Sequence, residues 1–225
     1  MLIGQKFIFI HYPRTGGTSV RNHLSRLFPD NYLPMSDPRL SRDQQVNLMH
    51  QSLVVCHQYA RQSGVNPSLL PTLVCIRNPY SLMLSEYMYL KQKWGKKIKD
   101  LDKTFSGYLN TLAKKVTAEK KQRWKQSHYG RYQDFLCING SIPANLTIAR
   151  YETLEEDVNR FIAEQLGVSD SKAKLPHKNA SRHGKVAAYY TEKDEQLVYD
   201  MWQNVFDNGL YDRYDGLETD NKSSS

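Results

Sequence analysis

The sequence predicts an α/β fold in which a central parallel sheet is covered by helices on both faces. Short apolar runs typical of strands alternate along the chain with segments whose apolar residues repeat at helical spacing. The run TLVCI is apolar almost throughout, as expected for a strand that is covered on both sides. Polar side chains that directly follow parallel strands are expected to gather at one edge of the sheet, where ligands bind.

Short apolar stretches define the predicted strands, and local sequence signals define the helices. After the first strand, Val20, Leu24 and Leu27 repeat at i, i+4 and i+7, which makes one face of a helix. Asn78 can cap a helix that begins at Pro79. The predicted strands are residues 6–11, 52–57, 71–77 and 145–152.

Capping signals define two further helices. Thr153 and Glu156 stand in capping-box positions before an amphipathic segment that Gly167 ends. A last amphipathic helix is predicted from Thr191, as its cap, to Gly209. Residues 168–190 are predicted as a polar, basic loop, and a short helix is predicted near 41–50.

The composition indicates a globular protein, and the length suffices for one domain with a full core or for two very small ones. The chain has 225 residues, of which 40% are hydrophobic, and a formal net charge of +8. Residues 1–217 are predicted to form a single domain, and residues 218–225 a disordered tail. Thirteen Lys and Arg against three Asp and Glu fall within residues 91–131, which are predicted as a basic helical insertion. The charge indicates anionic partners but does not choose among nucleic acid, membrane, nucleotide and acidic polysaccharide.

Cysteine usage predicts a reducing compartment, and the hydropathy of the chain predicts that it does not span a membrane. The three cysteines are odd in number, form no CxxC pair and are predicted to be free thiols. His and Cys do not cluster at ligand spacing, so a metal site is not expected. The longest apolar runs are too short to span a bilayer, and no signal peptide is evident, so we expect a soluble, cytoplasmic protein.

The segment PRTGGTS, residues 13–19, resembles a phosphate-binding turn. A tight turn between a strand and a helix aims several backbone N–H groups at one point, and the helix dipole favours an anion there. Gly16 and Gly17 allow close approach, while Arg14 adds charge. The loop is neither GxxxxGK[ST] nor GxGxxG. The alternative is a plain glycine turn between a strand and a helix.

Other candidate residues follow the predicted strands. Arg77 ends a buried strand, where an unpaired charge is costly, so we expect it to face an anion, with Ser85 two helical turns further on. His57 follows another predicted strand, where it can act as a general base. Arg182 and Lys185 lie in a basic loop that can fold over a phosphate. Each residue taken alone also suits an ordinary structural or surface role.

Four segments carry a resemblance to a known family: IHYPRTGGTS, CHQ, CIRNPYSLMLSEYMYL and IARYETLEED. Taken in this order, they resemble the sulfotransferases that use 3′-phosphoadenosine 5′-phosphosulfate (PAPS). The resemblance covers most of residues 5–210. The chain looks closest to the carbohydrate branch of the family, which includes the heparan and uronyl 2-O- and 6-O-sulfotransferases. The resemblance implies a P-loop-like three-layer sandwich, and PAPS as donor with no metal. It also implies a transfer to an acceptor hydroxyl by in-line displacement that leaves 3′-phosphoadenosine 5′-phosphate (PAP).

The resemblance also implies roles for individual residues. His57 matches the general base of the 2-O-type enzymes, while Arg14 stands where the family usually has Lys and is expected to stabilise charge on the leaving phosphate. Arg77 and Ser85 are expected to bind the 3′-phosphate. Arg182 and Lys185 match further donor contacts loosely. The residues expected to bind the 5′-phosphosulfate are Arg14, Thr15, Gly16, Gly17, Thr18 and Ser19.

The sequence is compatible with several classes of acceptor. An acidic glycan suits the basic stretch 91–131, whose KQKWGKK and KKQRWK combine charge with Trp, although a solvated lysine-rich surface suits it equally. A small metabolite, a lipid or a tyrosine are alternatives. A P-loop nucleotide or small-molecule kinase is a rival function, but the Gly-Lys pair and a carboxylate for Mg²⁺ are not evident. A non-catalytic nucleic-acid-binding protein is another, which predicts strongly salt-dependent binding.

Overall fold

The chain divides into two compact units. The first unit comprises Met1–Ile76 with His128–Lys178, and the second comprises Arg77–Ser127 with Asn179–Ser225. The computed structural model describes residues 1–31, 50–94, 104–118, 132–168, 174–175 and 185–213. The predicted helix near 41–50, most of the loop 168–190, much of the stretch 91–131 and the tail 218–225 lie outside these ranges.

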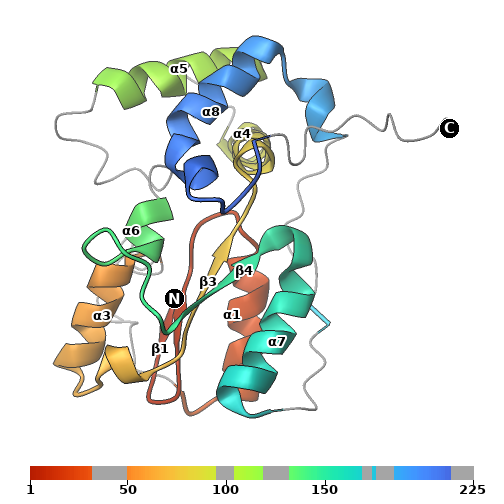
Figure 1. Ribbon diagram of the computed structural model, residues 1–225. Coiled ribbons are helices and arrows are strands. Elements are labelled where there is room, and N and C mark those ends of the chain that lie inside the picture. Colours follow the sequence, from red (N-terminus) through yellow and green to blue (C-terminus); the bar gives the residue numbers. More distant parts are fainter. Residues whose placement is uncertain (32–49, 95–103, 119–131, 169–173, 176–184, 214–225) are drawn as a thin grey trace, which may run out of the picture. The chain divides into compact units, whose positions relative to one another are not determined.

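The first unit is an α/β sandwich, as the alternating pattern predicts (Figure 1). Helices α1 and α7 cover one face of the sheet, and α3 and α6 contact the other. The elements of this unit are β1 Leu2–Ile3, β2 Ile8–Ile10, α1 Gly17–Leu27, α3 Leu53–Gln62, η1 Pro67–Leu69, β3 Thr72–Ile76, α6 Tyr132–Leu136, β4 Leu146–Arg150, η3 Tyr151–Thr153 and α7 Leu154–Leu166.

The sheet has the strand order β1-β2-β3-β4. Strands β2, β3 and β4 are parallel, with Phe9 opposite Leu73 and Leu73 opposite Thr147. The short strand β1 is antiparallel to β2 and was not predicted. All five residues of β3 are buried, which agrees with a strand covered on both faces. The predicted strands at 6–11, 71–77 and 145–152 are therefore confirmed.

The predicted strand at 52–57 is wrong, because these residues begin helix α3. The hydroxyl of Ser52 accepts a hydrogen bond from the N–H of Val55 at 3.3 Å and caps the helix. The buried residues of α3 recur at i, i+3, i+4 and i+7, which is the period of a helix. They are Leu53, Cys56, His57 and Ala60.

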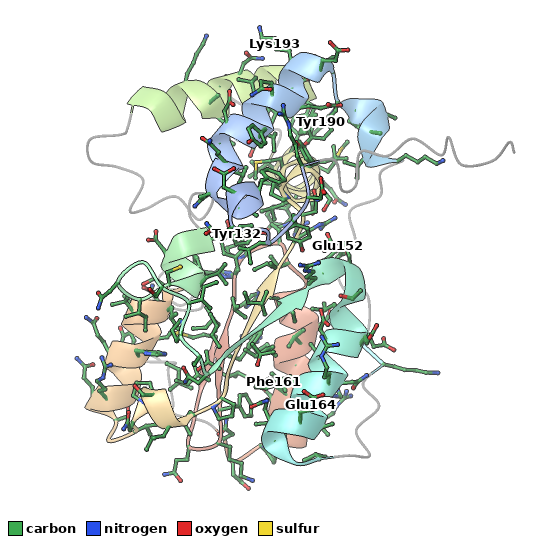
Figure 2. The ribbon with its side chains drawn as sticks, in the orientation of Figure 1. Tyr132, Glu152, Phe161, Glu164, Tyr190 and Lys193 are labelled. Atoms are coloured by element: carbon green, nitrogen blue, oxygen red, sulfur yellow. The ribbon has the colours of Figure 1, made fainter. Side chains whose placement is uncertain are left out.

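One hydrophobic core joins α1 and α7 to the sheet. Val20 and Leu24 of α1 pack with Phe7 and Phe9 from the region of β2, while Leu27, predicted on the same face, is 36% exposed. Figure 2 shows Phe161 extending from α7 into this core, where it meets the ring of Phe7 edge to face with centroids 6.5 Å apart.

The junction between β4 and α7 differs from the predicted capping box. Thr153 precedes α7, but its hydroxyl donates to the carboxylate of Asp157 at 2.8 Å instead of capping the backbone. The same Asp157 oxygen accepts from the N–H of Arg150, also at 2.8 Å. Asp157, and not Glu156, is therefore the carboxylate that bonds to Thr153. Gly167 ends the helix in the left-handed conformation at φ 69°, as predicted.

The second unit consists of helices, with many aromatic rings between them. Asn78 caps α4 by accepting from the N–H of Tyr80, and Thr191 and Asp194 form a capping box on α8, so both predicted caps are confirmed. Tyr190, labelled in Figure 2, donates its hydroxyl to the carbonyl of Tyr80 at 2.8 Å. The elements are α4 Pro79–Trp94, α5 Phe105–Ala118, η4 Val186–Tyr189 and α8 Glu192–Asp207. No helix in the described ranges is long and apolar enough to cross a bilayer.

Candidate functional site

The loop between β2 and α1 presents the start of a helix without a side-chain cap. Gly16 occupies the cap position of α1 at φ 78°, and having no side chain it cannot cap the helix. The N–H groups of Ser19 and Val20 bond the carbonyl of Gly16. Among the described residues, the N–H groups of Gly17 and Thr18 reach no backbone carbonyl. Uncapped N–H groups at the positive end of a helix attract an anion.

The side chains of the loop divide into inward and outward groups. Thr15 is fully buried, and its hydroxyl donates to the carbonyl of Tyr12 at 2.9 Å, so this hydroxyl proton is used within the loop. Ser19 is buried, whereas Arg14 and Thr18 are partly exposed. The backbone of Arg14 has a positive φ of 63°, which is uncommon outside glycine and asparagine. Strain of this kind is often found where a loop is shaped for a ligand.

The two glycines are required by packing as well as by conformation. A Cβ on Gly17 would lie 2.2 Å from Cδ2 of His11. A Cβ on Gly16 would lie 2.6 Å from a methyl carbon of Leu154 and 3.3 Å from the ring of Tyr151. The loop is therefore held between the end of β2 on one side and the β4–α7 junction on the other.

A histidine pair lies beside this loop. The rings of His11 and His50 meet edge to face with centroids 4.5 Å apart, and Nδ1 of His50 is 2.9 Å from the carbonyl oxygen of His11. Burial lowers the pKa of His11 well below its ordinary 6.5, and electrostatic interactions with His50, the Met1 amine and Arg21 lower it further. His50 was not predicted as a site residue, because its contact with His11 spans 39 residues of sequence.

His57 lies on α3 and does not follow a strand. Its side chain is on the buried face of the helix, and the residue is 3% exposed. Nε2 of His57 is buried and has no hydrogen-bond partner among the described residues. Burial lowers the pKa of His57, with a further contribution from Arg61, so the ring is neutral at pH 7. A neutral imidazole with an unused ring nitrogen has the chemistry of a base.

Within the second unit, Arg77 and Ser85 belong to the start and the flank of α4. Arg77 follows β3 directly in the sequence, and both residues are buried, at 7% and 1% exposure. Nε of Arg77 donates to the hydroxyl of Ser81 at 2.8 Å. Ser81 was not predicted, although its place four residues after Arg77 is a local signal that a search of the sequence can find.

The predicted basic loop is described only in part. Arg182 lies outside the described ranges, and Lys185 is exposed just before η4. The predicted donor-binding residues within the described ranges thus fall into two groups. One is the loop after β2 in the first unit, and the other is the beginning of α4 with Lys185 in the second.

Comparison with known proteins identifies the chain. The family model described as the sulfotransferase family matches residues 4–215, which is nearly the whole length. A comparison with curated proteins gave no match. The match includes the loop after β2, the helix α4 that follows β3 and the β4–α7 junction. The chain therefore belongs to the sulfotransferase family, whose members are enzymes that transfer a sulfuryl group from PAPS.

Proposed function

We propose that this enzyme transfers the sulfuryl group of PAPS to a hydroxyl of a carbohydrate. The observation that carries the proposal is the uncapped start of α1 in a chain that the family model matches from residue 4 to residue 215. Both compact units are included, as one sulfotransferase domain of residues 1–217. The family match favours sulfuryl transfer over the phosphoryl transfer of a kinase.

The loop after β2 is proposed to hold the 5′-phosphosulfate. The N–H groups of Gly17 and Thr18 supply donors, and the dipole of α1 adds to the attraction. Because the hydroxyl of Thr15 already donates to Tyr12, Thr15 is proposed to act through its backbone N–H. The remaining proposed contacts are Arg14, Gly16 and Ser19.

A second phosphate distinguishes this donor from common nucleotides. Arg77 and Ser85 are proposed to bind the 3′-phosphate, because a buried guanidinium just before α4 and a buried hydroxyl on the flank of that helix suit an anion. Lys185 and Arg182 are proposed as further contacts to the donor. PAP should therefore bind more tightly than adenosine 5′-phosphate, which lacks the 3′-phosphate.

The proposed reaction is an in-line displacement. The acceptor oxygen forms a bond to sulfur while the bond from sulfur to the bridging oxygen breaks, and PAP leaves. His57 takes the proton of the acceptor hydroxyl, and Arg14 stabilises the negative charge that develops on the leaving phosphate. Alignment and charge stabilisation supply most of the rate in such transfers. The lowered pKa of His57 supports its part, because the ring is neutral when the acceptor arrives.

The acceptor class is tested directly by turnover. Purified enzyme with PAPS is offered desulfated glycosaminoglycans, a small hydroxylated metabolite, a lipid alcohol and a tyrosine peptide, and PAP release is measured for each. The carbohydrate proposal expects the glycans to be used most efficiently. If only a non-carbohydrate acceptor is turned over, the proposed acceptor class is wrong, but the proposal of sulfuryl transfer stands. Calorimetry with PAP against ATP–Mg²⁺ tests the donor separately, and a preference for ATP would contradict it.

A further inference from the structure

The first turn of α4 contains a hydrogen-bond chain that ends on Arg77. The hydroxyl of Ser81 accepts from Nε of Arg77 at 2.8 Å and lies 3.2 Å from the carbonyl of Asn78, to which it donates. The side chain of Asn78 in turn accepts from the N–H of Tyr80 at 2.9 Å and caps the helix. Ser81 therefore links the guanidinium to a fixed point of the helix backbone.

This link holds one edge of the guanidinium through a neutral acceptor. The acceptor for Nε is a neutral hydroxyl, so the bond orients Arg77 without neutralising it. A carboxylate at the same position would hold the guanidinium equally well but would cancel the charge that an anionic ligand needs. Ser81 is also one helical turn before Ser85, so the two hydroxyls share a face of α4.

We propose that Ser81 is a positioning residue that orients Arg77 for the 3′-phosphate of the donor and so sets the preference for 3′-phosphorylated nucleotides. The inference rests on the proposed function, in which Arg77 and Ser85 bind that phosphate. The hydroxyl acts through Arg77, because its own proton is donated to the carbonyl of Asn78.

The test compares the affinities of PAP and adenosine 5′-phosphate by calorimetry. Ser81→Ala should weaken PAP binding about tenfold, which is the change expected when one hydrogen bond to a charged group is lost. The affinity for adenosine 5′-phosphate should not change. Ser81→Thr keeps the hydroxyl and should keep the preference. Ser106→Ala is the matched control. It removes a hydroxyl of the same unit that donates to the carboxylate of Asp194 at 2.6 Å and belongs to a different helix from Ser81.

A charge variant separates binding from stability. Ser81→Asp places a carboxylate in the first turn of α4, where the helix dipole favours it, so the thermal midpoint should hold or rise. The same carboxylate should pair with Arg77 and reduce the affinity for PAP by more than Ser81→Ala does. In an Arg77→Ala background, Ser81→Ala should not change the preference further.

The outcomes distinguish the inference from the function on which it rests. If the natural enzyme binds both nucleotides equally, the 3′-phosphate site is wrong and the role of Ser81 falls with it. If the natural enzyme prefers PAP and Ser81→Ala keeps the full preference, the site stands and the role of Ser81 is overturned. An equal loss of affinity for both nucleotides in Ser81→Ala would also overturn the role of Ser81, because a general structural defect does not discriminate between the two.

Discussion

The imidazole of His11 lies against the backbone of Gly17, so close that a Cβ at residue 17 would come within 2.2 Å of Cδ2. This contact joins the end of β2 to the first residue of α1 across the loop after β2. The ring of His11 is also in contact with Phe9 and His50, with centroids 6.0 and 4.5 Å away. The position of the loop thus depends on a packed ring as well as on the turn itself.

Gly17→Ala should destabilise the protein, although alanine is the better helix former. Helix propensity favours alanine by about 1 kcal/mol, but overpacking of this kind costs about 1–3 kcal/mol. Because His11 is held by Phe9 and His50, it cannot give way easily, and the loop must shift. We expect a lower thermal midpoint, by about 2–4 °C for each kcal/mol lost, together with weaker PAP binding.

The double variant His11→Ala with Gly17→Ala controls for this explanation. Removing the ring removes the collision, so part of the thermal midpoint lost in Gly17→Ala should return. A Gly17→Ala variant as stable as the natural protein would show that the His11 ring moves freely, contrary to the packing described here.

Gly16 and Gly64 form a matched pair with nearly the same backbone, at φ 78° and 77°. Alanine at either position carries the left-handed penalty of about 1–2 kcal/mol. At Gly64 the added Cβ meets nothing within 4 Å, whereas at Gly16 it would lie 2.6 Å from Leu154. Gly16→Ala should therefore cost more unfolding free energy than Gly64→Ala in chemical denaturation, and it alone should weaken PAP binding. If Gly16→Ala and Gly64→Ala lower the unfolding free energy equally, the requirement for glycine at residue 16 comes from its backbone conformation alone.

The sequence predicted most of the sheet, and the turn between β2 and α1, because their signals are local. The runs IFI and TLVCI are bounded by turns and followed by polar residues, and the caps at Asn78 and Thr191 are short motifs. The segment SLVVCH was misassigned because a short apolar run fits a strand or a buried helix equally well. The full repeat at i, i+3, i+4 and i+7 appears only when Ala60 is included, beyond the predicted strand.

Tertiary contacts explain what the sequence did not predict. His50 meets His11 across 39 residues, and no spacing rule predicts such a pair. Asp157 takes the N–H of Arg150 and the hydroxyl of Thr153 because η3 turns the chain back on α7, so the capping box at Glu156 was the wrong choice of carboxylate. The local signals of the motif were present, but the geometry of the preceding turn decided which acid is used.

The stability of the protein should fall as the pH falls below about 6.5. The folded-state pKa of His11 is well below the value of 6.5 expected in the unfolded chain, so below pH 6.5 the unfolded chain binds the extra proton first. One such histidine contributes at most about 1.4 kcal/mol per pH unit. His11→Asn does not titrate and should reduce the slope of the unfolding free energy between pH 7 and 5, while the lowered pKa values of His23 and His57 preserve part of it. The same slope in both proteins would contradict a neutral, buried His11.

The carboxylates of Asp157 and Glu156 should contribute very differently to stability. Asp157 is buried and accepts from Arg150, Thr153 and Arg160, whereas the Glu156 side chain is 75% exposed and 3.9 Å from Arg160. Asp157→Ala should cost about 1.5–3 kcal/mol or more of unfolding free energy, and Glu156→Ala less than about 1 kcal/mol. Denaturant unfolding at pH 7 measures both. A larger loss in Glu156→Ala would restore the predicted capping box.

His57→Ala should lower turnover at least a hundredfold while changing the affinity for PAP little, because a general base acts on the acceptor proton and not on the donor nucleotide. His23→Ala is a matched control. His23 is also buried, its Nε2 has no partner among the described residues, and burial lowers its pKa, but no role is proposed for it. Its turnover should stay near that of the natural enzyme.

The pH profile gives a second, independent measure of the base. Since the pKa of His57 is lowered from 6.5, kcat/KM should be flat above pH 7 and fall only below about 6.5, where the ring gains a proton and can no longer accept one. This acid limb should disappear from the residual activity of His57→Ala. His50→Ala decides between His50 and His57 as the base. A hundredfold loss there, with near-normal turnover in His57→Ala, would assign the base to the ring beside His11 and remove it from α3.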